Sequence, residues 1–470
     1  MPKAAFHTLG CKVNQCETAA LQVAFAAAGF TIVPPTELAD AYIINSCTVT
    51  ATGERKSLRA LRRFRRQNPE AIIALCGCLP QAFPEKAEAN TEADIILGTK
   101  NRASVLGAVE QMLAGKPGRL IDIPPHAGAG EEPFEELPTP KAANTTQEKA
   151  QPNHAKKNLA IPASPHQEEP TISTGTREKT RAFLKIQDGC ERTCAYCIIP
   201  KARGPLRSRP LDSLTAELKG FIAAGYKEVV LSGVNLGCYG HDLGLTLTDA
   251  LALACALPGL TRLRLGSLEP DLLDAATITA WAAYSGKLCD QFHLPLQSGC
   301  DQTLERMRRP YTTADYCRVA ALLREAFPGC AITTDIMTGF PGETEAEHAA
   351  TLAFIGEMAF ARAHIFCYSP RPGTPATSLP GRVPPPVATA RAREITALTD
   401  TSRREFLRTR IGKIYPVLFE ESQDGVAYGH TPCYTPVRVS SPGDISNQIL
   451  PVRLTAFAGD GDDGCAGELL

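Results

Sequence analysis

The chain has 470 residues, of which 44% are hydrophobic and 21% charged, and its 49 basic and 50 acidic residues leave a net charge of −1. This is the balance of a globular protein of several domains, with no overall positive field for nucleic acid, although local patches can still attract it. The start shows no apolar signal core and no run of about 18 apolar residues occurs, so we expect a cytoplasmic protein without a membrane span. The 17 cysteines are then expected to be reduced thiols, some of them metal ligands.

Residues 1–116 alternate short apolar runs with helical stretches. Strands are predicted at Ala4–Leu9, Ala41–Asn45, Ala71–Leu75 and Asp94–Leu97, and helices at Ala19–Ala28, Lys56–Arg66 and Ser104–Leu113. Alternation at this spacing is typical of βαβ units. We therefore expect an α/β N-terminal domain built on a parallel, flavodoxin-like sheet.

Residues 117–176 differ sharply in composition, since they hold ten of the 37 prolines and a single aromatic residue, Phe134. So little apolar surface does not offset the entropy lost when a chain is ordered. This segment is predicted to be a disordered or extended linker.

Residues 177–403 repeat the alternation on a larger scale. Strands are predicted at Phe183–Gln187, Glu228–Leu231, Arg262–Gly266, Phe292–Leu296, Ala331–Ile336 and His364–Tyr368, most of them followed by helices. Six successive βα units predict a partial (β/α)6 barrel, with its chemistry at the carboxyl ends of the strands. Residues 404–470 are predicted to form a small C-terminal β-barrel from the runs Val417–Glu420, Val426–His430, Tyr434–Val439 and Pro451–Ala456.

Three thiols stand close together in the loop Cys190-Glu-Arg-Thr-Cys194-Ala-Tyr-Cys197, directly after the first strand predicted for the central unit. Thiolates in so short a loop can reach one metal centre. Structural zinc normally takes four ligands, and no fourth follows at a suitable spacing, whereas three thiolates on a four-iron cluster leave one iron open for a small molecule. A zinc knuckle or a chance group of redox thiols is the alternative.

This loop resembles the C-x3-C-x2-C loop of the radical S-adenosylmethionine enzymes. The resemblance implies a [4Fe-4S] cluster on the three thiols, whose open iron binds S-adenosylmethionine and cleaves it to a 5′-deoxyadenosyl radical. Polar and glycine-rich segments near the strand ends resemble those around this cofactor, and the candidates for binding it are Tyr196, Ser232, Gly233, Asn235, Ser267, Glu269, Gln297, Asp335, Gly339 and Tyr368. Taken singly, each is as consistent with turn chemistry as with a ligand contact.

Three further thiols, Cys11, Cys47 and Cys78, each follow a predicted strand of the N-terminal domain. The carboxyl ends of the strands line up along one edge of a doubly wound sheet, so these residues should converge on one site. The alternative is that they fill the core, as free cysteines often do and as Cys16 and Cys76 are expected to do.

The segments around these thiols make the resemblance more specific. The N-terminal domain of the radical S-adenosylmethionine methylthiotransferases has segments similar to Thr8-Leu9-Gly10-Cys11-Lys12-Val13-Asn14-Gln15, Asn45-Ser46-Cys47-Thr48-Val49-Thr50 and Cys76-Gly77-Cys78-Leu79-Pro80-Gln81. The resemblance implies a second [4Fe-4S] cluster on Cys11, Cys47 and Cys78 that carries or delivers sulfur, and a second S-adenosylmethionine that supplies the methyl group. The Gly-Cys-Lys-Val-Asn-Gln form is most similar to members that act on N6-threonylcarbamoyladenosine in tRNA.

Two basic runs point to RNA. Arg55–Arg66 holds seven basic residues in twelve positions, and residues 177–210 hold nine basic and three acidic residues, among them Arg203, Arg207 and Arg209. Arginine forks suit phosphate, and basic patches bind RNA independently of sequence, although a charge run is as often a solvated helix face. The C-terminal β unit resembles the RNA-binding TRAM domain of this family, yet residues 404–470 hold six basic and nine acidic residues.

The expected function is insertion of a methylthio group at C2 of N6-threonylcarbamoyladenosine 37 in tRNA. An electron-donor protein and a sulfur source are the further partners expected. Methylthiolation of isopentenyladenosine in tRNA, or of a ribosomal protein, would use the same clusters. A non-enzymatic iron–sulfur protein that binds RNA is the alternative from another class.

Overall fold

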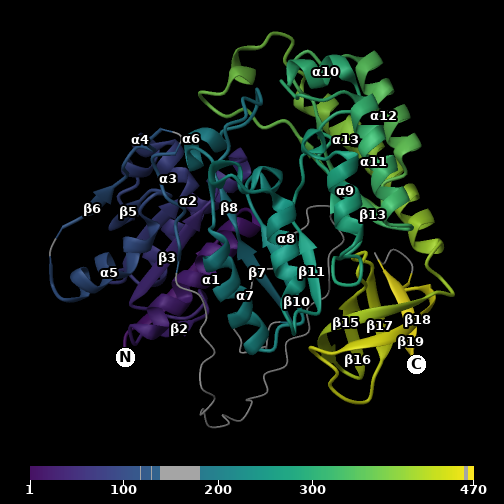
Figure 1. Ribbon diagram of the computed structural model, residues 1–470. Coiled ribbons are helices and arrows are strands. Elements are labelled where there is room, and N and C mark those ends of the chain that lie inside the picture. The colour runs from purple at the N-terminus through teal and green to yellow at the C-terminus, as the bar shows by residue number, and fades with distance from the viewer. Residues whose placement is uncertain (117, 129, 138–179, 460–463) are drawn as a thin grey trace.

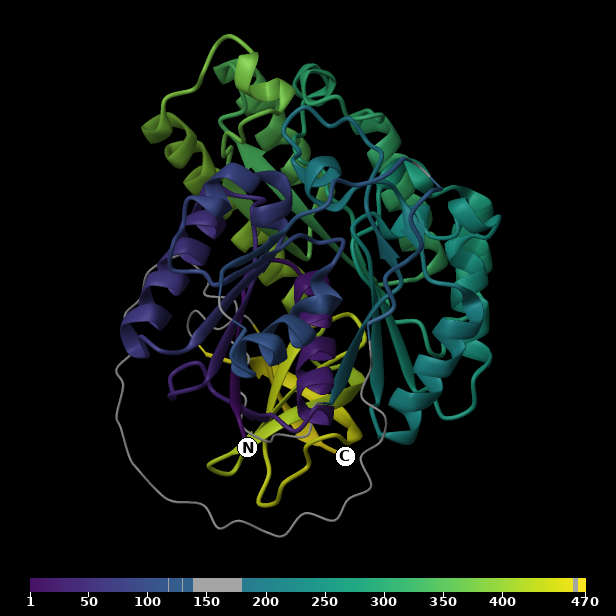
Figure 2. The ribbon, with the colours of Figure 1, turned by 90° about the vertical axis from the view of Figure 1, so that its left-hand side faces the viewer.

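The computed structural model describes residues 1–116, 118–128, 130–137, 180–459 and 464–470. It consists of an N-terminal α/β domain, a central open barrel and a small C-terminal β-barrel (Figure 1). The first two units lie side by side (Figure 2). Most of the predicted linker, residues 138–176, falls outside the described residues. No described helix has both the length and the apolar character needed to cross a membrane.

The N-terminal domain is a parallel sheet with helices on both faces. Its strand order, β2-β1-β3-β4-β5-β6, is the flavodoxin-like order with an added edge strand, as predicted. Its strands are β1 Lys3–Thr8, β2 Thr31–Val33, β3 Ala41–Ser46, β4 Ile72–Gly77, β5 Ile95–Leu97 and β6 Leu120–Asp122. Its helices are α1 Lys12–Ala27, α2 Ala51–Gln67, α3 Cys78–Ala82, α4 Pro84–Glu88 and α5 Val105–Leu113, with a 3-10 turn at Arg102–Ser104. Separate apolar layers cover the two faces, one around Phe64 of α2 and one around Phe25 of α1.

The N-terminal sheet extends beyond residue 116, where the sequence predicted a linker to begin. Strand β6 pairs in parallel with β5, Leu137 is buried, and Glu135 forms an ion pair with the buried Arg102 at 2.5 Å. The prediction from composition was wrong for the start of this segment, because backbone pairing and ion pairs order it although it has few apolar side chains.

The central unit is the predicted open barrel of parallel strands. These are β7 Arg181–Lys185, β10 Glu228–Ser232, β11 Arg262–Leu265, β12 Gln291–His293, β13 Ala331–Thr338 and β14 Arg362–Cys367. The sheets β7-β10-β11 and β12-β13-β14 are joined by the bridges Leu263–Leu288 and Ser267–His293. The helices are α6 Ile199–Arg203, α7 Leu211–Ala223, α8 Leu247–Ala256, α9 Ala275–Ala282, α10 Asp301–Arg306, α11 Thr313–Ala326 and α12 Glu345–Met358. Shorter elements are the pair β8 Gln187–Asp188 and β9 Arg207–Ser208 and the 3-10 turns Leu236–Cys238, His241–Leu243, Pro270–Leu272 and Pro375–Ser378.

The long helix α13, Pro385–Arg408, crosses the predicted boundary at residue 403 and leads into the C-terminal barrel. That barrel is closed in the order β15-β16-β17-β19-β18, which confirms the predicted small β-barrel. Its strands are β15 Ile414–Gln423, β16 Val426–His430, β17 Pro436–Ser440, β18 Ile449–Phe457 and β19 Cys465–Leu469, the last of them not predicted. It contacts the central strands through Arg264, whose guanidinium donates to the carbonyl oxygen of Pro432 at 2.8 Å.

Candidate active site

Three thiol-bearing loops meet at the edge of the N-terminal sheet, two of them where the strand order reverses between β1 and β3. Cys11 precedes α1, Cys47 follows β3 and Cys78 begins α3. A Cβ at Gly10, whose φ is +102°, would lie 2.8 Å from Cβ of Cys47 and 2.9 Å from its Sγ. The first two loops therefore touch only because residue 10 is glycine.

Two asparagines hold these loops together. Nδ2 of Asn14 donates to the carbonyl oxygens of Leu9 at 2.7 Å and Ser46 at 3.1 Å, and so ties the β1 loop to the β3 loop. Nδ2 of Asn45 donates to the carbonyl oxygen of Asn14 at 3.0 Å. Both asparagines stand in the segments that carry the family resemblance, but sequence reasoning gave neither a role.

Burial dominates the electrostatics of the thiols at this site. Burial raises the pKa of the Cys47 thiol to about 12, and the nearby Cys78 adds to the effect. Burial also raises the pKa of Cys78, against the pull of Arg203. Such thiols ionise when a cationic centre binds them. Among the described residues no three His, Cys, Asp or Glu side chains surround a single metal ion. A four-iron cluster suits three sulfurs on separate loops better, because its thiolates bind different irons.

The second set of thiols lies in the loop between β8 and α6. The N–H of Cys197 donates to the carbonyl oxygen of Cys194 at 3.1 Å, and Sγ of Cys197 accepts from the N–H of Ile199 at 3.4 Å. Gly189 precedes the loop with a φ of +72°, and a Cβ there would lie 1.7 Å from the carbonyl oxygen of Pro205. The turn into the loop therefore admits only glycine.

A buried arginine that sequence reasoning missed reaches this loop. Nη1 of Arg309 donates to Sγ of Cys194 at 3.3 Å, and Nη2 pairs with the carboxylate of Glu269. Nε of the same side chain donates to the hydroxyl of Tyr311 at 3.0 Å. The predicted cofactor residue Glu269 thus lies one side chain away from the thiol loop. Arg309 follows α10 rather than a strand, so its position in the sequence gave no signal.

Several predicted cofactor residues carry buried polar atoms that find no partner in the described part of the chain. These atoms are Oγ of Ser232, Oδ1 of Asn235, Oε1 of Gln297 and the hydroxyl of Tyr368. Gln297 also holds a φ of +68°, an uncommon conformation that is concentrated at functional sites. An unpaired buried polar atom costs about 1–3 kcal/mol, so a group of them near the strand ends fits a polar ligand such as the amino acid or ribose part of S-adenosylmethionine.

Other predicted cofactor residues lie at the same end of the barrel. Gly233 and Ser267 line the central cavity. The carboxylate of Asp335 faces Nε2 of His293 at 3.3 Å, and this pairing lowers the pKa of the carboxyl against the effect of burial.

Three of the predicted residues gather around Phe340. The rings of Tyr196 and Tyr368 meet that of Phe340 edge-on, with centroids 6.4 and 5.4 Å away. Gly339 has a packing role, since a Cβ there would lie 2.4 Å from Cβ of Ala388 on α13. This close packing explains why residue 339 is glycine, without a contact to the cofactor.

A cavity of about 430 Å³ inside the open barrel, which we call the chamber, joins the three units. Cys11 lines it from the N-terminal domain, Ser232 and Ser267 from the barrel, and Tyr434 from the C-terminal barrel. Its volume falls in the range of about 300–1,000 Å³ that is usual for small-molecule sites. A ligand in the chamber would lie between the first thiol set and the strand ends beside the second.

Tyr434 is a chamber residue that the sequence placed in a strand. Its φ is +63°, and β17 begins only at Pro436. The ring stacks on His430 with centroids 4.6 Å apart, and the hydroxyl accepts a hydrogen bond from Arg181 at 2.7 Å. A bulky residue held in the left-handed region is strained, which fits a position fixed for binding.

The loop after β14 holds the loop that carries Cys47. Nη2 of Arg371 donates to Oγ1 of Thr48 at 2.7 Å and pairs with Glu54 at the start of α2. Oγ of Ser369 accepts from the N–H of Ala51 at 3.0 Å. The loop at the sixth strand end of the barrel thus supports the loop of the first thiol set.

The predicted RNA contacts of Arg203, Arg207 and Arg209 are wrong, because these side chains are buried in ion pairs. They are 0%, 6% and 6% exposed. Their partners are Glu17 and Asp188 for Arg203, Glu132 for Arg207 and Glu217 for Arg209. A guanidinium satisfied in this way has no surface to offer a phosphate.

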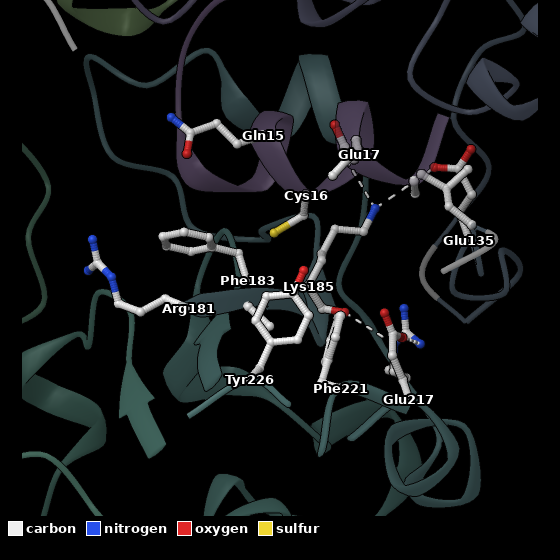
Figure 3. Close-up of a pocket in the computed structure, with 15 residues that line it drawn as sticks. Gln15, Cys16, Glu17, Glu135, Arg181, Phe183, Lys185, Glu217, Phe221 and Tyr226 are labelled. Carbon is white, nitrogen blue, oxygen red and sulfur yellow. Dashed lines mark hydrogen bonds and ion pairs between the residues drawn. The ribbon is translucent and has the colours of Figure 1, made fainter. Parts of the chain in front are cut away.

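Glu17 on α1 is the centre of an ionic network between the N-terminal domain and the barrel. Its carboxylate contacts Arg203 at 2.9 Å, Lys185 at 3.1 Å and Arg102 at 2.9 Å. Glu17 and Lys185 lie beside a smaller cavity of about 100 Å³, into which Cys16 also points (Figure 3). Cys16 belongs to neither thiol set, in line with its predicted packing role.

Two family models match the chain. One is described as uncharacterized protein family UPF0004 and covers residues 3–98, and the other is the Radical SAM superfamily, over residues 184–355. The barrel, its thiol loop and these matches define a radical S-adenosylmethionine enzyme, a class that uses S-adenosylmethionine and a [4Fe-4S] cluster.

Relatives identify the family within that class. The threonylcarbamoyladenosine tRNA methylthiotransferase MtaB of Bacillus subtilis (strain 168) is 34% identical over 97% of this chain and 94% of its own length. The tRNA-2-methylthio-N(6)-dimethylallyladenosine synthase of Akkermansia muciniphila is 30% identical over 98% of this chain and 97% of its own length. This chain belongs to the radical S-adenosylmethionine tRNA methylthiotransferase family.

A solved structure shares the fold. The radical S-adenosylmethionine methyltransferase TsrM from Kitasatospora setae superposes with a TM-score of 0.52 at 14% identity, over 78% of this chain and 73% of that one.

Proposed function

We propose that this chain inserts a methylthio group at C2 of N6-threonylcarbamoyladenosine at position 37 of tRNA. The chamber is the observation that carries the proposal, because Cys11 of one thiol set lines it together with Ser232 and Ser267. The same strand-end loops contact the other thiol set, through Asn235 to Cys190 and through Glu269 and Arg309 to Cys194. Sulfur insertion needs both a radical that breaks an unactivated C–H bond and a source of sulfur within reach of the same carbon. The relative of Bacillus subtilis named for this activity supports the assignment.

Two [4Fe-4S] clusters would be held by this chain, one on Cys190, Cys194 and Cys197 and the other on Cys11, Cys47 and Cys78. When bound in the barrel, the cluster and S-adenosylmethionine supply the 5′-deoxyadenosyl radical, and a second S-adenosylmethionine supplies the methyl group. The role of the protein is to position these reagents. Ser232, Asn235 and Gln297 would orient the cofactor through their unpaired polar atoms, while Arg309 holds the thiol loop.

The reaction consumes electrons and sulfur, so an electron-donor protein and a sulfur source are partners of the enzyme. We place it in the cytoplasm, where tRNA is modified.

RNA would contact the exposed face of α2 rather than the buried arginines after the thiol loop. Helix α2 buries Leu61 and Phe64 and exposes the basic residues Arg55, Lys56, Arg59, Arg62, Arg63 and Arg66. A one-sided row of cations beside the Cys47 loop suits the phosphate backbone of a tRNA whose base occupies the chamber. The C-terminal barrel, which contributes Tyr434 to the chamber, would contact the same RNA as a TRAM-like domain.

Mass spectrometry of nucleosides from bulk tRNA tests the assignment. A strain that lacks this chain should lose 2-methylthio-N6-threonylcarbamoyladenosine and regain it when the wild-type chain is supplied. Complementation with a Cys194→Ala chain is the matched negative control. If the methylthio derivative of isopentenyladenosine disappears instead, the substrate is wrong but the chemistry stands. If no methylthio nucleoside changes in a strain without a paralogue, the target is not tRNA, and a ribosomal protein is the next substrate to examine.

A further inference from the structure

The chamber is lined by more cations than its own carboxylates neutralise. Lys12 projects into it from the start of α1, together with Arg181, Arg264 and Arg362 of the barrel strands. No Asp or Glu is among the described residues that line it. A cation on such a wall that has no carboxylate partner attracts an anionic ligand, since surrounding low-dielectric groups strengthen its field.

The arginines of the chamber are already engaged. Arg264 pairs with Glu228 at 2.7 Å, Arg181 pairs with Glu420, and Arg362 is not without a partner either. Lys12 differs, because its amine makes no hydrogen bond or ion pair within the described ranges of the chain. An ammonium group without a partner on the chamber wall is available to a ligand.

We propose that Lys12 binds the carboxylate of the threonylcarbamoyl group and thereby selects this substrate. The inference rests on the proposed function and adds the residue that reads the substituent on N6. Lys12 lines the same chamber as Cys11, so its amine faces the space in which the modified base would be held. A neutral isopentenyl group has no charged or hydrogen-bonding atom for this amine. A site that hydrogen-bonds a polar group of its substrate rejects analogues without that group.

Two other anions could meet Lys12, namely an RNA phosphate and the carboxylate of S-adenosylmethionine. The position of Lys12 favours the substrate. It projects from the N-terminal domain, whereas the unpaired polar atoms assigned to the cofactor belong to strand ends of the barrel. The test must separate these three anions.

The experiment pairs a change in the enzyme with a change in the substrate. The full-length enzyme with reconstituted clusters is given tRNA with N6-threonylcarbamoyladenosine, or the same tRNA after its threonyl carboxylate has been converted to the methylamide. Wild type, Lys12→Met and Lys12→Arg are compared, with Lys219→Met on the exposed face of α7 as the control, and kcat/KM is measured by mass spectrometry of the methylthio product. For wild type and the control, kcat/KM should be roughly ten- to a hundredfold higher on the tRNA with the free carboxylate than on the methylamide. This is the factor that a hydrogen bond to a charged group contributes. In Lys12→Met, kcat/KM on the carboxylate tRNA should fall to its value on the methylamide tRNA. Lys12→Arg should retain most of the wild-type preference for the carboxylate.

The outcomes against the inference are distinct. An unchanged preference in Lys12→Met overturns it. An equal loss on both tRNAs points to a phosphate contact or a structural role and also overturns it. A parallel fall in cleavage of S-adenosylmethionine without tRNA assigns Lys12 to the cofactor carboxylate instead. If wild type modifies neither tRNA but methylthiolates an isopentenyladenosine tRNA, the proposed function has failed and the inference falls with it.

Discussion

The guanidinium of Arg309 donates a hydrogen bond to the sulfur of Cys194 over 3.3 Å. Because the same side chain pairs with Glu269, the thiol loop and the loop after β11 share one buried cation. The guanidinium thus places a positive charge against the sulfur, where it complements the negative charge of a metal-bound thiolate. Arg309 is therefore expected to support the barrel site although no motif marks it.

Replacement of Arg309 by Met keeps apolar bulk and removes the charge. We expect cleavage of S-adenosylmethionine to slow roughly ten- to a hundredfold, since a hydrogen bond to a charged group contributes about 1.5–3 kcal/mol. The rate of 5′-deoxyadenosine formation, measured together with iron content, checks this. The neighbouring Arg308 is exposed, so Arg308→Met is the matched control. Equal rates in the two variants would contradict the role.

The two thiol sets should fail in different ways. Cys194→Ala should abolish 5′-deoxyadenosine formation. Cys47→Ala should spare that reaction and stop methylthio product, because its thiol lies at the other site. Anaerobic assays of both products, with iron quantified per chain, separate the two. Cys76→Ala, a buried thiol outside both sets, is the control. Methylthio product from Cys47→Ala would exclude its role in sulfur delivery.

Removal of the charge of Glu17 should destabilise the protein in a pH-dependent way. Burial alone would raise the pKa of Glu17, but Arg102, Arg203 and Lys185 outweigh it and lower the pKa from 4.5 to about 2. Glu17→Gln leaves buried cations without a counter-charge, which typically costs about 3–5 kcal/mol.

A carboxyl whose pKa is lower in the folded state stabilises the protein above its unfolded pKa and loses that contribution as the pH falls towards the folded value. The difference between wild type and Glu17→Gln should therefore be full at pH 7 and shrink between pH 4.5 and about 2. Urea denaturation of the cluster-free protein across this range measures it. The exposed Glu110→Gln on α5 is the control, and a difference that stays constant with pH would refute the network.

The basic face of α2 should set the salt dependence of tRNA binding. The triple variant Arg59→Gln, Arg62→Gln and Arg66→Gln should lower the slope of log Kd against log salt by about 2–3, since each phosphate contact contributes about 0.7–0.9. Fluorescence anisotropy of labelled tRNA at several salt concentrations gives the slope. A Lys219→Gln and Arg318→Gln double variant alters exposed cations on barrel helices instead. Identical slopes for wild type and the triple variant would remove α2 from the RNA surface.

The sequence predicted the strands that are buried on both faces. Such strands read as apolar runs, as Ala41–Ser46 does with every residue buried. Strands β2 and β6 were missed because they are not buried apolar runs: β2 buries one of its three residues and β6 none, whereas the equally short and predicted β5 buries all three. Strand β19 was missed for a different reason, because its acidic surroundings resemble a solvated chain end.

The sequence identified those site residues that stand in a short motif or directly after a predicted strand. The thiol loop of Cys190 forms a motif, and the other thiols follow predicted strands. Arg203 was misread because its partner Glu17 is 186 positions away in the sequence, so the same basic run looked accessible. Arg309 and Tyr434 were missed for the same reason, since tertiary contacts alone bring them to the site.

The ionic network around Glu17 has a consequence for biosynthesis. Of the cations that contact this carboxylate, Arg102 alone belongs to the N-terminal domain, while Lys185 and Arg203 follow much later in the chain. A nascent chain therefore completes every strand of its first sheet while most of the charge that balances Glu17 is still untranslated. The loop that carries Cys47 reaches its final anchoring even later, when Arg371 has been translated and contacts Thr48. Cys78 is likewise translated well before Ile198 and Ala202, the barrel residues that pack in the same apolar cluster.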